Sequence, residues 1–297
     1  LVKAWESKNA KNAAKAGGVS LMALSLAACG GSSTTVTTPV VDTPVVDTPV
    51  VDTPVVDAAK SIAMTATMDN LAGGSGNDTF SGVVQAAGAT GTTAFPGDIV
   101  DGGAGSDTLT ISVAGDAGGA YTIAALDINN VEVVQIANFD VNAGATTVDT
   151  VLMDGVTTFG LSSSSATGDT IFSNVAAVTN ATMSNGSGDM TLTYTAAAVV
   201  GTADTQNLAV SNLAAGTFTA DGTENLVITS SLAKSTVAAV ASDALKTVTI
   251  SGDQDIKITA ALDFASNGTA SSGSVAAVAG AVVDASALTG KLTMTTT

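Results

Sequence analysis

The sequence contains no histidine and no arginine, and only one cysteine, Cys29, among its 297 residues. Without histidine the chain has neither Ser-His-Asp nor Cys-His catalysis, and no imidazole ligand for a metal. A single cysteine excludes an internal disulfide framework and a thiolate zinc site. Carboxylate pairs such as Asp253 and Asp255 fit solvated turn charges better than acid–base catalysis. We therefore expect that the chain is not an enzyme.

Positive charge is scarce, because nine lysines face 26 acidic residues and leave a net charge of −17. The excess lies in residues 61–297, which contain four lysines and 21 acids. Since phosphate contacts need cations, nucleic acid is not an expected partner. Aromatic residues make up only 3% of a chain that is 45% hydrophobic, and Thr, Ser and Gly are abundant. This composition favours thin stacked strands with tight turns over a helical core.

Residues 1–29 form the first predicted segment. They begin with a lysine-rich, Ala-rich stretch that favours a helix, and an apolar run of about ten residues follows, too short for a bilayer. The sequence Leu26-Ala27-Ala28-Cys29 resembles a bacterial lipobox. That resemblance implies a secretory signal and a lipid on Cys29. The alternative is an N-terminal helix with an incidental buried cysteine.

Residues 30–59 form a predicted flexible linker. A Gly/Ser stretch leads into a repeat of Pro-Val-Val-Asp-Thr, which holds four of the five prolines in the chain. Proline favours extended backbone, so the spacer could reach roughly 60 Å. We interpret it as a stalk for residues 60–297, with a neutral interdomain linker as the alternative. The final strand pattern runs up to Thr297, so we expect the domain to continue beyond it.

Two segments match the nonapeptide G-G-x-G-x-D-x-U-x, in which U is a large apolar residue. They are Gly73–Ser81 and Gly102–Thr110. Glycine permits the tight turn and inward carbonyls, and aspartate supplies the hard oxygen that Ca²⁺ prefers. The candidate metal site therefore consists of eight residues: Asp78, Asp107, Asp101, Asp98, Gly74, Gly76, Gly103 and Gly105.

The two matches begin at Gly73 and Gly102, which is farther apart than a tandem array requires. Tandem nonapeptides place turns on the same side two repeats apart, a distance of about 18 residues. We therefore predict an insertion of about 11 residues within Val84–Phe95. Two calcium turns predict one or two Ca²⁺ ions as the cofactor. The alternative is a pair of Gly-Asp hairpin turns that bind no metal.

Apolar residues then alternate with Thr and Ser, which is typical of half-buried strands. Strands are expected to begin near residues 109, 131, 151, 171, 192, 208, 226 and 248. A recurrent spacing of about 20 residues predicts an all-β fold, a β-solenoid with calcium turns at its N-terminal end, with a β-sandwich as the alternative. Asparagines are expected to cap turns at four positions: Asn130, Asn174, Asn212 and Asn225.

Several segments resemble bacterial RTX-type surface-layer (S-layer) proteins over residues 70–297. They are Asp98–Leu109, Thr223–Ile228, Leu245–Ile250 and Val283–Gly290. The resemblance implies a calcium-stabilised β-solenoid that assembles into a two-dimensional coat. It also implies that Asp78 and Asp107 are calcium ligands, together with carbonyls of the Gly-rich turns.

The expected function is that of a secreted structural protein on the bacterial cell surface. Its expected partners are other copies of itself and an envelope lipid or surface polysaccharide. The alternative is a lipid-anchored adhesin or binding module on the same scaffold, an outer-membrane lipoprotein. An adhesin would expose clustered aromatic residues, whereas Tyr121, Phe139, Phe159 and Phe172 are scattered.

Overall fold

The computed structural model describes residues 57–86, 90–115, 119–141, 144–262, 264 and 282–295. Every helix or strand in these residues is a β-strand, which confirms the all-β prediction. The helix predicted within residues 1–29 and the predicted lipidation residue Cys29 lie outside the described residues, as does most of the linker predicted for residues 30–59.

The largest sheet has ten strands, all paired in parallel with their neighbours. In spatial order they are β1 (Ser61–Ala63), β3 (Thr79–Ala86), β5 (Thr108–Gly115), β8 (Val133–Asn138), β11 (Thr158–Ser162), β13 (Asn180–Ser184), β15 (Thr205–Ser211), β17 (Asn225–Ser230), β20 (Thr247–Gly252) and β22 (Val282–Leu288).

Three smaller parallel sheets complete the described structure. The six-stranded sheet contains β19 (Ala239–Ala241), β16 (Thr217–Thr219), β14 (Met190–Tyr194), β12 (Thr170–Val175), β9 (Thr146–Asp149) and β6 (Tyr121–Ile123). The four-stranded sheet contains β10 (Met153–Asp154), β7 (Asp127–Asn129), β4 (Ile99–Gly103) and β2 (Asn70–Gly74). The three-stranded sheet contains β18 (Ser235–Val237), β21 (Ile256–Ile258) and β23 (Leu292–Met294).

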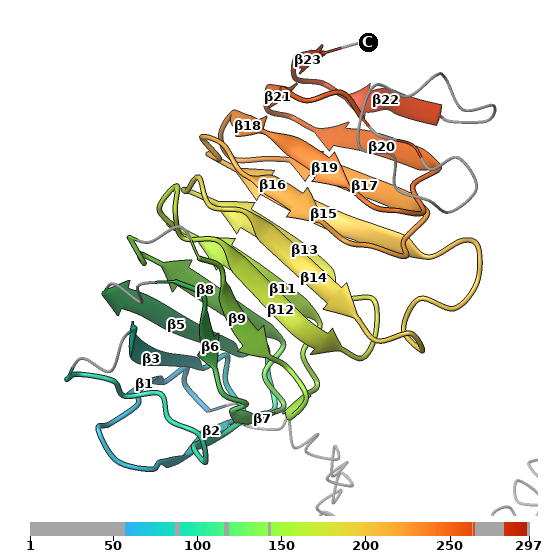
Figure 1. Cartoon of the computed structure of the whole chain (residues 1–297). Helices are drawn as coiled ribbons and strands as arrows, with labels where there is room; N and C mark the ends of the chain where they lie inside the picture. The colour runs from blue at the N-terminus through green and yellow to red at the C-terminus, as the bar shows by residue number, and fades with distance from the viewer. Residues whose placement is uncertain are drawn as a thin grey trace, which may run out of the picture. The chain divides into compact units, whose positions relative to one another are not determined.

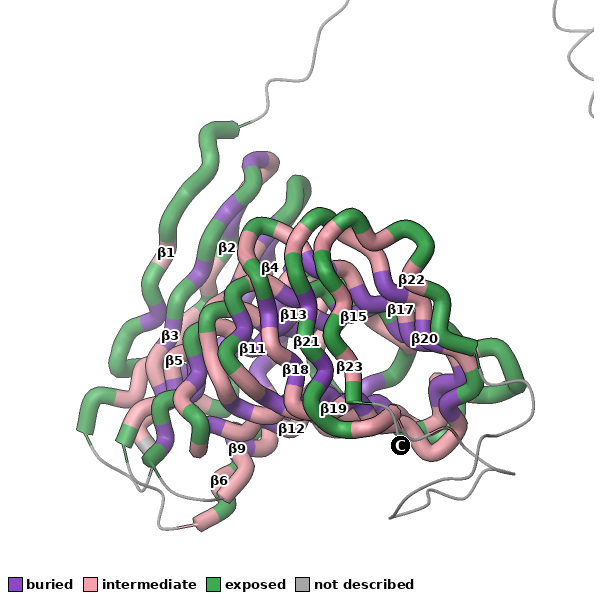
Figure 2. Tube along the Cα trace, turned by 90° about the horizontal axis from the view of Figure 1, so that it is seen from above, coloured by how far each residue is buried: buried purple, intermediate pink, exposed green. Residues whose placement is uncertain are grey.

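Successive coils of the chain stack to form a β-solenoid (Figure 1). Each coil adds one strand to the ten-stranded sheet and then turns into a smaller sheet, so partners across coils are parallel. Along β5, Leu109, Ile111 and Val113 are fully buried while the Thr and Ser residues between them are half-buried. Buried positions recur inside the stack from coil to coil (Figure 2). The fold is therefore the predicted solenoid, and the sandwich alternative is wrong.

Coil length varies more than the regular spacing predicted from the sequence. Ser61 pairs with Thr79, whereas Thr79 pairs with Thr108, so the second of these coils is much longer than the first. The predicted strand starts near 171 and 192 lie in the six-stranded sheet, and the start near 151 lies in a turn. The apparent period therefore mixed strands of two sheets. Corner loops tolerate changes in length, and only the core pattern must repeat.

The extra residues of this longer coil lie where the sequence placed them, within Val84–Phe95. After β3 the chain folds back, and the hydroxyls of Thr92 and Thr93 accept the N–H groups of Gln85 and Val83 at 3.0 and 2.8 Å. The insertion thus packs on the strand that precedes it and leaves the Gly-rich turns in register.

Of the four asparagines expected to cap turns, Asn130 and Asn212 lie at bends between strands, whereas Asn174 lies within β12 where its register with β14 shifts. Asn130, Asn174 and Asn212 all adopt positive φ between 50 and 62°, where asparagine is tolerated better than most residues. Asn225 differs, because it is the first residue of β17 and accepts the hydroxyl of Thr247 at 2.7 Å.

Candidate metal centre

The two Gly-rich segments stack directly on one another at one corner of the solenoid. Gly74 pairs with Gly103 between β2 and β4, and Thr79 pairs with Thr108 between β3 and β5. The close approach needs glycine, because a side-chain carbon at Gly105, where φ is +131°, would lie 2.5 Å from the carbonyl oxygen of Gly76. The nonapeptides therefore form two successive coil turns.

Four charged residues stack at this corner, each directly before a strand of the ten-stranded sheet. We call Lys60, Asp78, Asp107 and Glu132 the acidic column. Each acid bonds the backbone of the coil before it: Asp78 Oδ1 accepts the Lys60 N–H at 2.6 Å, and Asp107 Oδ1 accepts the Asp78 N–H at 2.6 Å. Glu132 Oε2 accepts the Asp107 N–H at 2.7 Å. One carboxylate oxygen per residue thus continues the ladder of hydrogen bonds around the corner.

The second carboxylate oxygens of Asp78 and Asp107 have no hydrogen-bond partner among the described residues, although both residues are at most 1% exposed. Asp78 Oδ2 and the carbonyl oxygen of Gly102 both face the α-carbon of Gly73, where a side-chain carbon would collide with them. Asp107 Oδ2 and the carbonyl oxygen of Asn130 face the α-carbon of Gly102 in the same way. We call these two oxygen-lined spaces the first and second cradles.

The carbonyl of Gly73 stacks with those of Gly102 and Asn130, and it already contacts a cation. Lys60 occupies the position of Asp78 one coil earlier, and its ammonium donates a hydrogen bond to the carbonyl oxygen of Gly73. In the next two coils the corresponding carbonyls face carboxylate oxygens instead. Two oxygen acceptors that face each other repel, so both cradles favour a positively charged occupant.

The charges of the acidic column also favour a bound cation. Three carboxylates and one ammonium leave a formal charge of −2 at a corner where Asp78 and Asp107 are buried, Glu132 is half-buried and Lys60 is exposed. Burial raises the pKa of Asp107, and the nearby carboxylates of Glu132, Asp78 and Asp101 raise it further, against the lowering effect of the Asp78 N–H bond. A raised pKa means that the ionised carboxylate is electrostatically disfavoured here. A divalent cation would balance the column.

The structure brings together only part of the predicted ligand set. Asp78 and Asp107 lie in the column, and Gly74, Gly76, Gly103 and Gly105 form the turns beside it. Asp101 is close enough to affect Asp107, and its Oδ1 accepts the side-chain N–H of Asn130 at 2.9 Å.

Asp98 lies at the other end of β4, away from the Gly-rich turns. It is fully buried, and its two oxygens accept the N–H groups of Asp69 and Phe95 at 2.9 and 2.6 Å. Both oxygens are therefore used in the hydrogen-bond ladder of that corner.

Sequence reasoning missed Lys60, Glu132 and the carbonyl of Asn130. A usable signal exists for the first two, because a charged residue directly precedes the strand in each of the first four coils: Lys60-Ser61, Asp78-Thr79, Asp107-Thr108 and Glu132-Val133. The carbonyl of Asn130 has no such signal, since any residue supplies one.

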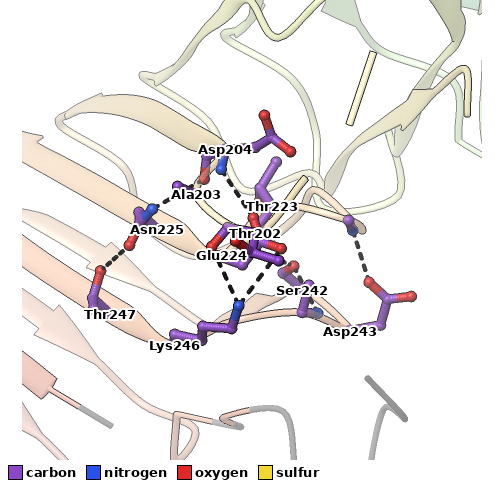
Figure 3. A network of polar contacts seen from close by, with 12 residues as sticks. Thr202, Ala203, Asp204, Thr223, Glu224, Asn225, Ser242, Asp243, Lys246 and Thr247 are labelled. Atoms are coloured by element: carbon purple, nitrogen blue, oxygen red, sulfur yellow. Dashed lines mark hydrogen bonds and ion pairs between the residues drawn. The ribbon is translucent and has the colours of Figure 1, made fainter. Parts of the chain in front are cut away.

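A second acidic corner shows what compensation by lysine looks like (Figure 3). Glu224 Oε2 accepts the Asp204 N–H at 2.9 Å, as Glu132 does for Asp107. Here the ammonium of Lys246 lies 3.8 Å from Glu224 Oε1 and donates to the carbonyl of Thr202 at 3.3 Å. The acidic column has no such lysine beside Asp107 or Glu132 among the described residues.

The two donors of each cradle are both oxygens, one from a side chain and one from the main chain. In the described part of the chain no three acidic side chains converge on one point, and each cradle combines one carboxylate oxygen with a carbonyl. Oxygen donors of this kind suit Ca²⁺.

No family model, curated protein or solved structure matches this chain. Among the residues that the structure describes, no helix is long and apolar enough to span a membrane.

Proposed function

We propose that this protein is a structural component of a bacterial cell surface, an S-layer-like β-solenoid that calcium stabilises and that associates with copies of itself. The observation that carries the proposal is the pair of cradles, in which buried, unpartnered oxygens of Asp78 and Asp107 face main-chain carbonyls. The resemblance of the Gly-rich segments to RTX-type surface-layer proteins supports the biological role.

Asp78 and Asp107 would hold the ion through their Oδ2 atoms, with the carbonyl oxygens of Gly102 and Asn130. The bound ion supplies positive charge between oxygens that otherwise repel. The Oδ1 atoms keep their bonds to the N–H groups of Lys60 and Asp78, so each carboxylate joins the preceding coil to the site. Neutralisation at this corner therefore stabilises the contact between successive coils.

This arrangement couples folding to the calcium concentration. Without the ion, three carboxylates and one ammonium leave the first coils under repulsion, and coils in a solenoid are stabilised mainly by their neighbours. Extracellular modules commonly bind Ca²⁺ with dissociation constants of about 10⁻⁴–10⁻³ M, so such sites fill outside the cell and stay empty in the cytosol. A protein exported to the surface would thus complete its folding there.

The first test is a calcium titration of the full chain, prepared in chelator and followed by far-UV circular dichroism and thermal unfolding, with magnesium as the control. We expect a rise in unfolding temperature that is specific to calcium. Asp78→Ala and Asp107→Ala should weaken the response, whereas Asp154→Ala, which changes an exposed carboxylate at the end of β10, should leave it unchanged. An unchanged spectrum and unfolding temperature in calcium and in chelator would contradict the calcium mechanism.

The second test concerns assembly and is read separately. Electron microscopy of the calcium-loaded protein on lipid vesicles should show ordered arrays, and chelation should disperse them. A calcium-stabilised protein that stays monomeric at high concentration and on membranes would refute the surface-layer role while leaving the metal site intact.

A further inference from the structure

Lysine is distributed very unevenly along the solenoid. Residues 61–230 contain 16 acidic residues and no lysine, whereas residues 231–297 contain four lysines. Three of those four, Lys234, Lys257 and Lys291, line one concave site with a volume of about 410 Å³. The fourth, Lys246, belongs to the second acidic corner. Most of the positive charge of the solenoid is thus gathered in one place.

The site lies on the three-stranded sheet of β18, β21 and β23, which stack at the C-terminal end of the described solenoid (Figure 1). Lys257 pairs with Thr236 on one side and with Thr293 on the other. Ser235, Ile256 and Leu292 pair with one another across the three strands. The residues directly before them in the sequence, Lys234, Asp255 and Lys291, therefore lie beside one another in the same order.

These residues form two parallel rows on the outer surface of the sheet. The core side chains Ile256 and Ile258 alternate with Lys257 along β21, so Lys257 points outward while its neighbours are buried. Coils are about 4.8 Å apart, which places Lys234 and Lys291 roughly 10 Å apart, on either side of Asp255.

The lysines are available to a ligand. None of the three forms an ion pair with another residue that the structure describes, although Asp255 lies in the same site. Asp255 Oδ1 instead accepts the backbone N–H of Lys291 at 2.8 Å. Three ammonium groups and one carboxylate give the site a formal charge of +2 on a strongly acidic molecule.

We propose that this lysine site binds an acidic sugar residue of a surface polysaccharide, through a carboxylate or phosphate group carried by the sugar. The lysines would hold the anionic group. The hydroxyls of Thr236 and Thr293 and the side chain of Asn212 also line the site and can exchange hydrogen bonds with sugar hydroxyls. The volume falls within the range of roughly 300–1,000 Å³ that is usual for small-molecule sites.

An acidic side chain of a second copy of the protein is the competing occupant, and the structure favours it less. Many carboxylates of the solenoid already accept backbone N–H groups, as Asp98, Asp107 and Glu132 do.

This inference rests on the proposed surface role and names the group through which the solenoid would hold its envelope. The test is calorimetric titration of the full chain, with calcium held constant, against trigalacturonic acid, the neutral trisaccharide maltotriose and sodium sulfate. We expect saturable binding of trigalacturonic acid, weaker binding of sulfate and none of maltotriose.

The matched variants carry the same change in charge. Lys257→Gln should weaken binding of trigalacturonic acid about fivefold, within the range for one exposed ion pair. Lys246→Gln, outside the site, should leave it unchanged. The triple variant of Lys234, Lys257 and Lys291 to Gln should not bind. Circular dichroism checks that all variants fold.

Four results would overturn the proposal. The first is the absence of binding to trigalacturonic acid, and the second is equal binding by the Lys257 and Lys246 variants. The third is sulfate binding as strong as that of the trisaccharide, which would mark a site for free anions only. The fourth is a dimer in sedimentation velocity that Lys257→Gln abolishes, which would identify a second copy as the occupant. A failed calcium titration with intact, lysine-dependent sugar binding would refute the calcium mechanism alone.

Discussion

Replacing Asp107 by asparagine tests its proposed role as a calcium ligand while keeping its structural role as a hydrogen-bond acceptor. The side-chain oxygen of asparagine can still accept the Asp78 N–H that Asp107 Oδ1 accepts at 2.6 Å. The amide nitrogen takes the place of the unpartnered Oδ2 and becomes a donor that faces the carbonyl of Asn130. The variant therefore keeps the hydrogen bond from the Asp78 N–H, and it replaces a repulsive pair of oxygens by a hydrogen bond.

The expected changes have opposite signs with and without calcium. An unsatisfied buried polar atom costs about 1–3 kcal/mol, so in chelator Asp107→Asn should raise the free energy of unfolding by about 1–2 kcal/mol. For a domain of this size that is an increase of about 2–8 °C in unfolding temperature. With a dissociation constant of about 10⁻⁴ M, calcium at a hundredfold excess stabilises the wild type by about 2.7 kcal/mol per site. The variant should lose that gain at the second cradle.

The assay is thermal unfolding of wild type and variant in chelator and in about 10 mM calcium, a hundredfold excess over the expected dissociation constant. Asp154→Asn, at an exposed position, is the control for removing one negative charge. The order of the unfolding temperatures should reverse between the two conditions, with the variant more stable in chelator and the wild type more stable in calcium. A variant that is destabilised in chelator, or that gains as much from calcium as the wild type, would refute the reasoning. Asp78→Asn repeats the test at the first cradle.

Three further predictions follow from the same structure. Burial and neighbouring acids raise the pKa of Asp107 in the folded state, so the calcium-free protein should gain stability as the pH falls from 7 towards 3.8, and Asp107→Asn should flatten this dependence in denaturant titrations at several pH values. Gly102→Ala should lower the free energy of unfolding by at least about 2 kcal/mol, because its side-chain carbon would collide with the carbonyl of Asn130; a denaturation midpoint equal to that of the wild type would contradict this. Leu232 is 86% exposed with φ at 64°, and it lies two residues beyond Ser230, as Asn212 lies two residues beyond its partner Val210. Leu232→Asn should raise the free energy of unfolding in denaturant titrations by about 1 kcal/mol, because the asparagine side chain can hydrogen-bond locally at positive φ, whereas Leu232→Ala, which has no such group, should not.

The solenoid could be predicted from the sequence because its physical basis is local. Apolar residues that alternate with Thr and Ser specify one buried face per strand, as Leu109, Ile111 and Val113 do in β5. Glycine and asparagine mark the corners for an equally local reason, since they tolerate positive φ. These signals identified the Gly-rich turns and the insertion between them.

The neighbours of each strand could not be predicted in the same way. The offset between paired strands is much shorter for Ser61 and Thr79 than for Thr79 and Thr108, because corner loops absorb insertions without changing the core. The strands expected near 171 and 192 exist as β12 and β14, but they belong to the six-stranded sheet, so the spacing of about 20 residues did not count coils.

The sequence by itself determined the class of fold, the two Gly-rich turns and the acidic charge, because each depends on residues that are close together along the chain. Only the tertiary structure placed Lys60 and Glu132 in one column with Asp78 and Asp107, and Lys234, Lys257 and Lys291 in one site. Stacking in register converts residues that are distant along the chain into neighbours, and that register depends on the packing of the whole coil.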